Sequence, residues 1–485
     1  MGIVTNQSFK NTITTYIGFG IGAINTLFLY TNFMSDTYYG LVGFILSTAN
    51  IMMPLMAFGT QNTLIKFYST YKTRNSINSF LTLMLLLPLV VIVPVGLIGY
   101  YAFDLISDLL SQKNPIIKDY VWLIFISAIA FAYFEIFYSW TKVQMQSVFG
   151  NFMKEVFHRV GVMILLFCLY FEWIDVVEFI YAVVGVYLLR MMVMKLYAYY
   201  IRRPVFRLDR LPNTREIMKY TSLIIIAGSI ANIILEIDKF MIGEYITIEN
   251  VAYYGVAIYI ASVISVPARS MHQITNPITA KLLNENDKAG LKDLYQKSSL
   301  NLFIIGGLIF LLIVLNIHEL YRIIPPEFGG GMSIVFLIGL AKLYDDLMGN
   351  NNAILFNSQY YRVVLVLGVF LAVMAIVLNM LLIPEYQIHG AAYATFLAVF
   401  FYNSAKLIYV KYKLDLLPFS TKTFKTGVLI AVMFVVFYYW DFPFHPIINI
   451  TCKSILIAGV YSLVVYRFNF SEDIRTIIKK FFKIK

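Results

Sequence analysis

A small set of charged and polar side chains lies inside otherwise apolar stretches of this sequence. An ionisable group in apolar surroundings is costly unless a partner neutralises it, so such groups mark pathways for ions or charged substrates by default. None of them shows the spacing of a hydrolytic triad or of a metal site. The candidates are Asn25, Asn32, Glu135, Glu236, Asp238, Lys239, Arg269, His272, Lys342, Asp345 and Asp346.

Spacing groups the acidic candidates with basic ones. Glu236 stands three residues before Lys239, and Lys342 stands three and four residues before Asp345 and Asp346. Side chains three or four residues apart are neighbours on a helix surface. Each group can therefore form a local ion pair. Such pairs either fix helix packing or take part in transport, and the spacing alone leaves both interpretations open.

The other candidates carry similar pairs of interpretations. Arg269 and His272 are one helical turn apart, either as part of a polar pathway or as a snorkelling arginine with a structural histidine. Asn25 and Asn32, seven residues apart, are expected on one helix face, where amides can also bond neighbouring helices. Glu135 stands alone and needs a partner from another helix or a bound proton.

The segments that must position these side chains are apolar helices. About fourteen of them, each long enough to cross the roughly 30 Å hydrocarbon core of a bilayer, fill the chain from Lys10 to Arg467. The sequence therefore predicts an all-α polytopic membrane protein. The predicted spans are residues 11–33, 39–62, 80–103, 119–141, 152–171, 176–200, 218–243, 251–275, 298–317, 333–356, 361–384, 387–410, 422–441 and 447–467.

Composition supports this class. Hydrophobic residues make up 60% of the chain and charged residues 13%, whereas soluble domains carry about 25% charged residues. The two cysteines lack metal-ligand spacing and are expected to be small core residues. No phosphate-binding loop of the Walker A type occurs, which argues against ATP hydrolysis.

Positive charge is distributed unevenly between the two sides of the predicted membrane. Of the 38 basic residues, 31 fall on the side shared by both termini, three on the other side and four inside spans. Lys154 and Lys406 are counted among the 31. Short cytoplasmic loops hold the excess of Lys and Arg, so both termini are predicted to be cytoplasmic. The net charge of +11 is then a topology signal with affinity for anionic lipid, and nucleic acid is not expected as a partner.

A short repeat divides the chain. Tyr38-Tyr39-Gly40 opens the second span and Tyr253-Tyr254-Gly255 opens the eighth, and each is followed by a proline inside its span. Six spans separate the copies, so the repeat is parallel, with a pseudo-two-fold axis along the membrane normal. We expect two six-helix bundles facing a central cavity. The predicted parts are a first bundle (1–200), a cytoplasmic linker (201–217), a second bundle (218–410), an extra helix pair (411–468) and a basic cytoplasmic tail (469–485).

The tail mixes isoleucine and phenylalanine with lysine. As a helix it would be basic and amphipathic, suited to the surface of the inner leaflet. A frayed basic end is the alternative.

Short motifs along the whole chain carry a family resemblance. They are Asn11 in the N-terminal run, the Tyr38–Gly40 sequence, Phe58–Asn62 with Lys66–Ser69, Asp238–Gly243, and His389–Thr395. Together they resemble the polysaccharide flippases, the O-antigen and capsule exporters of the multidrug/oligosaccharidyl-lipid/polysaccharide (MOP) superfamily. Fourteen spans with both ends inside match that branch.

The resemblance implies alternating access by two bundles, in a multi-pass protein of the bacterial cytoplasmic membrane. The implied substrate is a polyprenyl-diphosphate-linked oligosaccharide, moved for surface polysaccharide export. No cofactor is implied beyond a coupling ion, H⁺ or Na⁺, and membrane lipids, a polysaccharide polymerase and chain-length machinery are the implied partners. On this basis the substrate pathway would hold Arg269, Lys342, Lys239, Asn25, Asn32 and His272. The charge partners or coupling sites would be Glu236, Asp238, Asp345, Asp346 and Glu135.

Three alternatives remain at this point. A cation-coupled small-molecule exporter of the same superfamily usually has twelve spans, so residues 422–467 argue against it. A lipid II flippase differs from the main interpretation only in its substrate. A membrane glycosyltransferase or polymerase would need a sizeable outer loop, and no predicted outer loop exceeds about 20 residues. The prediction is therefore a transporter rather than an enzyme.

Overall fold

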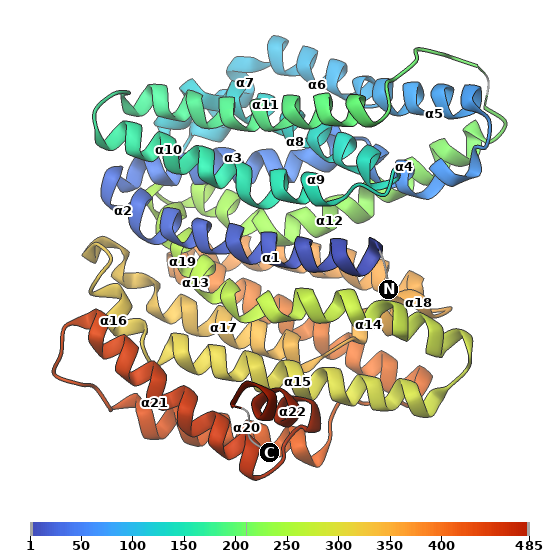
Figure 1. Ribbon diagram of the computed structural model, residues 1–485. Helices are drawn as coiled ribbons and strands as arrows, with labels where there is room; N and C mark the ends of the chain where they lie inside the picture. The colour runs from blue at the N-terminus through green and yellow to red at the C-terminus, as the bar shows by residue number, and fades with distance from the viewer. Residues whose placement is uncertain (1–2, 210, 483–485) are drawn as a thin grey trace. The chain divides into compact units, whose positions relative to one another are not determined.

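The computed structural model describes residues 3–209 and 211–482, and these residues form helices and no strand. The predicted all-α class is thereby confirmed for this part of the chain, while Arg210 and tail residues 483–485 lie outside it. The first elements are α1 (Ile3–Ile24), η1 (Asn25–Leu29), α2 (Tyr30–Phe33), α3 (Asp36–Met56), α4 (Thr60–Phe67), η2 (Tyr68–Thr70), α5 (Arg74–Leu86), α6 (Leu89–Tyr101), α7 (Phe103–Ser111), η3 (Pro115–Tyr120), α8 (Val121–Lys142), α9 (Val148–Phe152), η4 (Met153–Phe157), α10 (His158–Tyr170), α11 (Val176–Ile201) and α12 (Thr214–Tyr245) (Figure 1). The remaining elements are α13 (Glu249–Ser262), η5 (Val263–Ser265), α14 (Val266–Asn284), α15 (Lys288–Val314), α16 (Ile317–Tyr321), η6 (Pro326–Gly331), α17 (Met332–Leu347), α18 (Asn351–Asn357), α19 (Tyr361–Leu414), α20 (Thr421–Tyr438), α21 (Pro446–Arg467) and α22 (Glu472–Phe482).

The helices form two compact units, Met1–Ala252 and Tyr253–Lys485, called unit 1 and unit 2 below. The boundary predicted at residues 201–217 does not coincide with the boundary between these units. The reason is the packing of α12, which lies along α3 and α4 and so places the seventh predicted span in unit 1.

Unit 1 is organised around α8. This helix packs between α3 and α11, and α4 also contacts it. Its core is rich in aromatic side chains, with Phe80, Phe134 and Trp140 at most 1% exposed. In unit 2 the central helix is α15, which contacts α14, α17, α20 and α21. Tyr461 of α21 is buried there and donates a hydrogen bond to Ile304 O at 3.0 Å.

Local sequence sets several of the helix starts. Asp175 and Glu178 form a reciprocal capping box that begins α11, satisfying backbone N–H groups that a helix leaves open at its first turn. Ser420 and Thr423 do the same for α20. These caps lie at the predicted starts of the spans 176–200 and 422–441, so the sequence defines where both helices begin.

Eleven helices in the described part of the chain are long and apolar enough to cross a membrane, or twelve when the bent α12 counts as one span. Fourteen spans are therefore not confirmed as a count. The difference lies in two places. The predicted span 152–171 corresponds to the irregular η4–α10 stretch, and the predicted spans 361–384 and 387–410 both fall within the 54 residues of α19.

The helix α19 is a hairpin rather than one rod. Gln387 has φ 53° and ψ −134°, which no helical residue adopts. A Cβ added to Gly390 would lie 2.1 Å from Leu382 O, although residues eight apart in a straight helix are about 12 Å apart. The chain therefore folds back at Gln387, which is where the sequence places the boundary between two spans.

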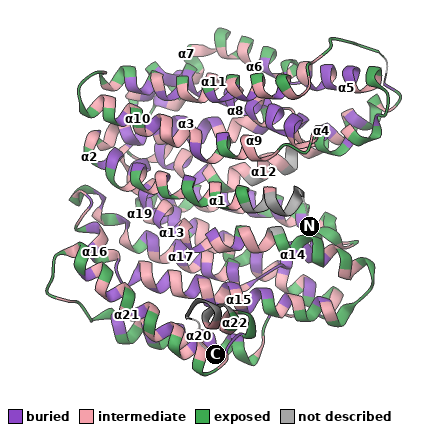
Figure 2. Ribbon diagram, viewed as in Figure 1, coloured by how far each residue is buried: buried purple, intermediate pink, exposed green. Residues whose placement is uncertain are grey.

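Many helices carry residues that are exposed (green in Figure 2), and numerous large apolar residues are among them. Val90, Tyr101 and Leu196 are 61%, 84% and 68% exposed. Exposure of this kind is unfavourable in water but favourable against lipid tails. The exposed apolar surface thus supports a multi-pass membrane protein independently of helix length.

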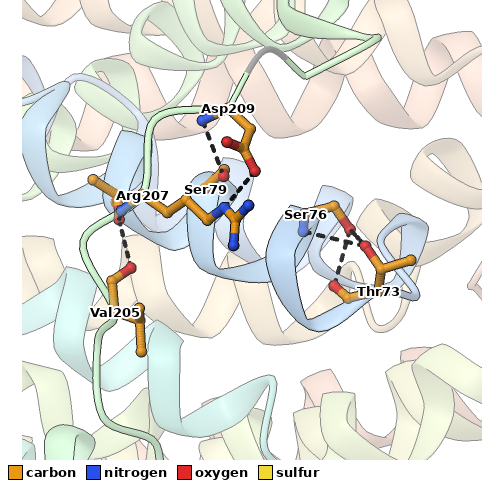
Figure 3. Close-up of polar contacts among 7 residues, drawn as sticks. Thr73, Ser76, Ser79, Val205, Arg207 and Asp209 are labelled. Atoms are coloured by element: carbon orange, nitrogen blue, oxygen red, sulfur yellow. Dashed lines mark hydrogen bonds and ion pairs between the residues drawn. The ribbon is translucent and has the colours of Figure 1, made fainter.

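The linker after α11 is held on α5 by polar contacts (Figure 3). Asp209 N donates to Ser79 Oγ at 3.2 Å, and Arg207 pairs with Asp209 at 2.5 Å. Thr82 Oγ1, on the same helix face as Ser79, receives a hydrogen bond from Arg207 N at 3.2 Å. These contacts fix the path of the chain toward α12.

The tail forms a helix over Glu472–Phe482, so the helical alternative is the one observed in the described residues. Asn301 of α15 anchors it. Its Nδ2 donates to Asp473 Oδ2 at 2.8 Å, and its Oδ1 accepts from Ser471 Oγ at 2.6 Å. These two contacts hold the start of α22 beside α15.

Candidate functional site

Glu135, isolated in the sequence, has a partner from another helix. Its Oε1 accepts a hydrogen bond from Lys154 Nζ at 2.6 Å, linking α8 to η4. The carboxylate side chain is 17% exposed and the lysine 44%. The sequence-based expectation that Glu135 needs a partner is met by a lysine that the charge count assigned to the cytoplasmic flank.

Arg190 of α11 is buried beside this pair. Its guanidinium carbon lies 4.2 Å from the ring centre of Phe134, 4.9 Å from that of Tyr187 and 5.6 Å from that of Phe131. Aromatic faces attract cations, so this box of rings stabilises the guanidinium where water is scarce. Glu135 is also close enough to interact with it electrostatically.

A second ion pair continues the cluster along the chain. Arg159 Nη1 lies 3.6 Å from Glu155 Oε2, one turn away. Four basic side chains (Lys142, Lys154, Arg159 and Arg190) thus share this region with two carboxylates (Glu135 and Glu155), a formal net charge of +2. We call these six residues the unit 1 charge cluster.

The first helix packs directly on this cluster. A Cβ added to Gly18 would lie 2.3 Å from Glu155 O, so only glycine allows α1 to approach η4 this closely. Further along, Asn25 Nδ2 donates to Arg159 O at 2.8 Å. Both η1 and η4 are π-helical, a geometry that often marks functional sites.

The two asparagines of the first span do not share one environment. Asn25 is buried, whereas Asn32 is exposed and donates to Phe28 O of its own helix at 2.7 Å. The expectation of one common face fails because the π-helical turn η1 lies between them. A π turn holds an extra residue and rotates the following side chains around the axis.

In α12 the predicted local pair is present. Lys239 Nζ lies 3.2 Å from Glu236 Oε2, and both side chains are partly buried, at 27% and 21% exposure. Asp238 is buried next to them, at 7%. These three side chains carry a formal net charge of −1 and belong to unit 1.

The pair predicted within α17 is not formed. No atom of Lys342 lies within ion-pair distance of Asp345 or Asp346 in the described part of the chain, and each aspartate faces a different helix. Asp345 Oδ1 accepts from Asn403 Nδ2 of α19 at 3.1 Å. Asp346 is 2% exposed and packs against Gly306 of α15. Contacts with neighbouring helices, rather than spacing along α17, therefore determine the surroundings of both aspartates.

Lys406, counted on the cytoplasmic flank by sequence, is buried in unit 2. It is 1% exposed, donates from Nζ to Asn352 Oδ1 at 2.9 Å, and lies 4.1 Å from the ring centre of Tyr402. Since lysine is almost never fully buried without a partner, this position is a structural or functional site that charge counting could not reveal.

Amides and hydroxyls surround these charges. Asn350 Nδ2 donates to Thr279 Oγ1 at 2.7 Å, and Asn351 Nδ2 donates to Tyr295 Oη at 2.6 Å. Together with Asn352 they form a run of three asparagines. The run connects α14, α15, α18 and α19 through hydrogen bonds. We call Asp345, Asp346, Asn403, Lys406 and residues 350–352 the unit 2 polar cluster.

A pocket of about 580 Å³ borders this cluster, and His272 and Asn352 are among the residues that line it. Asp345 and Lys406 are near enough to interact with the imidazole electrostatically. Arg269, one turn earlier, is exposed. The pocket is lined by His272, Asn276, Pro277, Ala280, Asn352, Ala353, Phe356 and Asn357.

Residues 4–283 match the family model described as polysaccharide biosynthesis protein. The chain belongs to this family. Comparison with curated protein sequences gives no match. The match of the family model covers more than half of the chain, including the unit 1 charge cluster and His272.

Several solved structures share the fold of this chain. The lipid II flippase MurJ, in an inward closed conformation, is 13% identical with a TM-score of 0.75, covering 95% of this chain and 99% of that one. An inward-facing multidrug resistance MATE family transporter of the MOP superfamily is 14% identical with a TM-score of 0.59, covering 84% and 94%. A MOP superfamily transporter from Pyrococcus furiosus, described as having a binding pocket of reverse polarity, is 14% identical with a TM-score of 0.51, covering 84% and 95%. The fold is that of MOP superfamily transporters.

The described residues hold no group of three or more His, Cys, Asp or Glu side chains that could bind a metal. The buried polar side chains described above form ion pairs and amide networks. Such an arrangement can bind and release charged groups without forming or breaking covalent bonds.

Proposed function

We propose that this protein flips a polyprenyl-diphosphate-linked oligosaccharide across the bacterial cytoplasmic membrane, for export of a surface polysaccharide. The carrying observation is the match of residues 4–283 to the polysaccharide biosynthesis family. Charged side chains buried within apolar helices support it, because a diphosphate needs offsetting charge to leave water. The lipid tail stays in hydrocarbon during the movement, so only the polar head needs such a path.

The proposed pathway uses two of the cations that form no ion pair in the described part of the chain. Among the described residues, Arg269 and Lys342 make no ion pair within 4 Å, and His272 lines a pocket. We assign Arg269 and Lys342 to offsetting phosphate charge, and His272, Asn25 and Asn32 to contacts with sugar hydroxyls. Lys239 is held by Glu236 and enters the pathway only when that pair opens.

The coupling site is proposed at Asp346. This carboxylate is 2% exposed, and its Oδ2 has no hydrogen-bond partner among the described residues. A buried carboxyl group of this kind exchanges H⁺ or binds Na⁺ when its surroundings rearrange. Asp345 is the adjacent acidic group, and Glu135, Glu236 and Asp238 serve as charge partners elsewhere.

The same proposal includes transport by alternating access and termini that lie in the cytoplasm. It also includes the polysaccharide polymerase and the chain-length machinery as partners. The 31-to-3 distribution of basic residues supports the orientation.

Deletion of the gene tests the proposal. The readout is the membrane face on which the polyprenyl-linked oligosaccharide resides. Accumulation on the cytoplasmic face, with glycan synthesis intact and surface polysaccharide lost, is the expected result. Normal surface glycan would contradict it and favour a small-molecule exporter. Loss of the linked oligosaccharide, or outward-facing units left unpolymerised, would favour an enzyme.

A lipid II flippase is the second candidate, because the similarity to MurJ extends over 95% of this chain. The deletion strain separates the two. Arrest of cell-wall synthesis with cytoplasmic lipid II would support the second candidate and contradict the first.

A further inference from the structure

Arg190 presents a buried donor that the protein does not satisfy. The residue is 7% exposed, and among the described residues its Nε has no hydrogen-bond partner. The rings of Phe134 and Tyr187 cover the faces of the guanidinium, which leaves its N–H edge as the part able to bind a ligand. Buried polar groups are nearly always bonded, so an unbonded arginine edge calls for a reason.

A second unbonded donor belongs to the neighbouring helix. Arg159 Nη1 is buried, and at 3.6 Å its ion pair with Glu155 is too long for a hydrogen bond. The helices that carry the two arginines, α10 and α11, pack against each other. The imidazole of His158 interacts electrostatically with both guanidinium groups, which places them around one region.

The same region has an excess of positive charge. The unit 1 charge cluster holds four cations and two carboxylates, a formal net charge of +2. An uncompensated buried charge is strongly unfavourable. A ligand with two negative charges would neutralise the excess and accept hydrogen bonds from both arginine edges.

We propose that Arg159, Arg190 and Lys154 form a binding site in unit 1 for a phosphate or diphosphate ester anion. Arginine suits this ligand because its planar fork of donors matches phosphate oxygens. Lys154 is 44% exposed, so its ammonium group can turn from Glu135 to the anion. The inference rests on the proposed function where the anion is the diphosphate of the lipid-linked oligosaccharide. The headgroup of an anionic phospholipid is the other source of the same chemistry.

Binding to the purified full-length protein in phosphatidylcholine nanodiscs tests the site. The probes are geranylgeranyl diphosphate, geranylgeraniol and phosphatidylglycerol, and the readout is the dissociation constant of each. We expect geranylgeranyl diphosphate to bind more tightly than geranylgeraniol. R190Q and R159Q are each expected to weaken the diphosphate probe about tenfold, with geranylgeraniol unchanged. E135Q, which removes a negative charge, is expected to tighten it.

Two variants keep the test clear of misfolding. R159Q alters a partly exposed side chain, and R190K keeps the charge while losing the fork, so R190K should bind more tightly than R190Q. K118Q removes an exposed cation of unit 1 that pairs with Asp108, and serves as the matched control. Unchanged diphosphate affinity in R159Q and R190Q would overturn the site.

The three probes also distinguish between the two possible sources of the anion, the lipid-linked oligosaccharide and an anionic phospholipid. Competition by phosphatidylglycerol that disappears in R190Q would support the site and assign it to bilayer lipid. Normal surface polysaccharide in the deletion strain would contradict the proposed flippase function. It would not change the measured affinity for geranylgeranyl diphosphate, so the two proposals can be overturned independently.

Discussion

The two units of this protein bury charge in different ways. The unit 1 charge cluster contains more cations than carboxylates and holds Arg190 among aromatic rings. The unit 2 polar cluster contains Asp345 and Asp346 with Lys406 inside a network of asparagines. The first arrangement leaves buried arginine donors unbonded and favours an anionic ligand. The second leaves buried oxygens of Asp346, Asn351 and Asn403 without a hydrogen-bond partner among the described residues.

This difference suggests a division of labour between ligand and coupling ion. A cluster with surplus positive charge gains from binding a diphosphate. A buried carboxyl group next to a second acidic residue gains from binding a proton or a cation. Four changes, described from the largest expected effect to the smallest, would break or sharpen this contrast.

The change D346N should have the largest effect. Asparagine keeps the shape of the side chain but cannot take up a proton or balance a cation, so we expect ion-driven transport to fall about 100-fold, roughly 2.7 kcal/mol. The measurement is the rate of flipping in proteoliposomes with an imposed H⁺ or Na⁺ gradient. D108N, at an exposed aspartate, is the matched control. An unchanged rate in D346N would remove unit 2 from coupling.

The change G18A should destabilise unit 1. The added methyl group would meet the rigid backbone at Glu155 O, 2.3 Å away, and overpacking of this kind costs about 2 kcal/mol. G20A, two residues on, meets nothing within 4 Å and is the control. Thermal unfolding in detergent should separate the two variants. Equal melting temperatures would show that α1 does not pack on η4 in this way.

The change G306A tests the corresponding contact in unit 2 with a smaller expected effect. The added Cβ would lie 2.3 Å from Asp346 Oδ2. A side-chain oxygen moves more easily than backbone, so we expect a loss of about 1 kcal/mol. G255A, which meets nothing within 4 Å, is the control. G306A should also slow transport by displacing Asp346, and an unaffected rate would argue against the coupling role.

The change E236Q should have the smallest effect. The pair of Glu236 and Lys239 lies within one helix at 3.2 Å and outside both clusters. Pairs of this type contribute about 1 kcal/mol or less. A double-mutant cycle with K239Q measures the coupling energy of the pair by thermal unfolding. A coupling energy well above about 1 kcal/mol would show that this pair stabilises the protein more than an ordinary ion pair within one helix.

Much of the architecture could be predicted from hydropathy and charge. The all-helical class, the turn between the spans of α19 and the pair of Glu236 with Lys239 follow from apolar length and helical spacing. Glu135 could be recognised as needing a partner, because a lone carboxylate in a span is costly.

The rest depends on contacts between distant segments. Lys154 and Lys406 were counted as flanking cations because a charge count assigns residues to a side and carries no information on depth. The pair within α17 was expected from spacing, but Asp345 is bonded to Asn403 of α19 and Asp346 packs against Gly306 of α15. No sequence pattern signals the π-helical turn η1, which separates the surroundings of Asn25 and Asn32.

The most direct test of the account is flipping of a fluorescent polyprenyl-diphosphate-linked oligosaccharide by the purified protein in proteoliposomes. A membrane-impermeant quencher reports how much of the label stays protected. The account predicts flipping that requires the diphosphate in the substrate and is slowed in R190Q, with K118Q behaving as the unaltered protein. Protein-dependent flipping that is equally fast for the same lipid without its diphosphate, or no flipping at all, would contradict it.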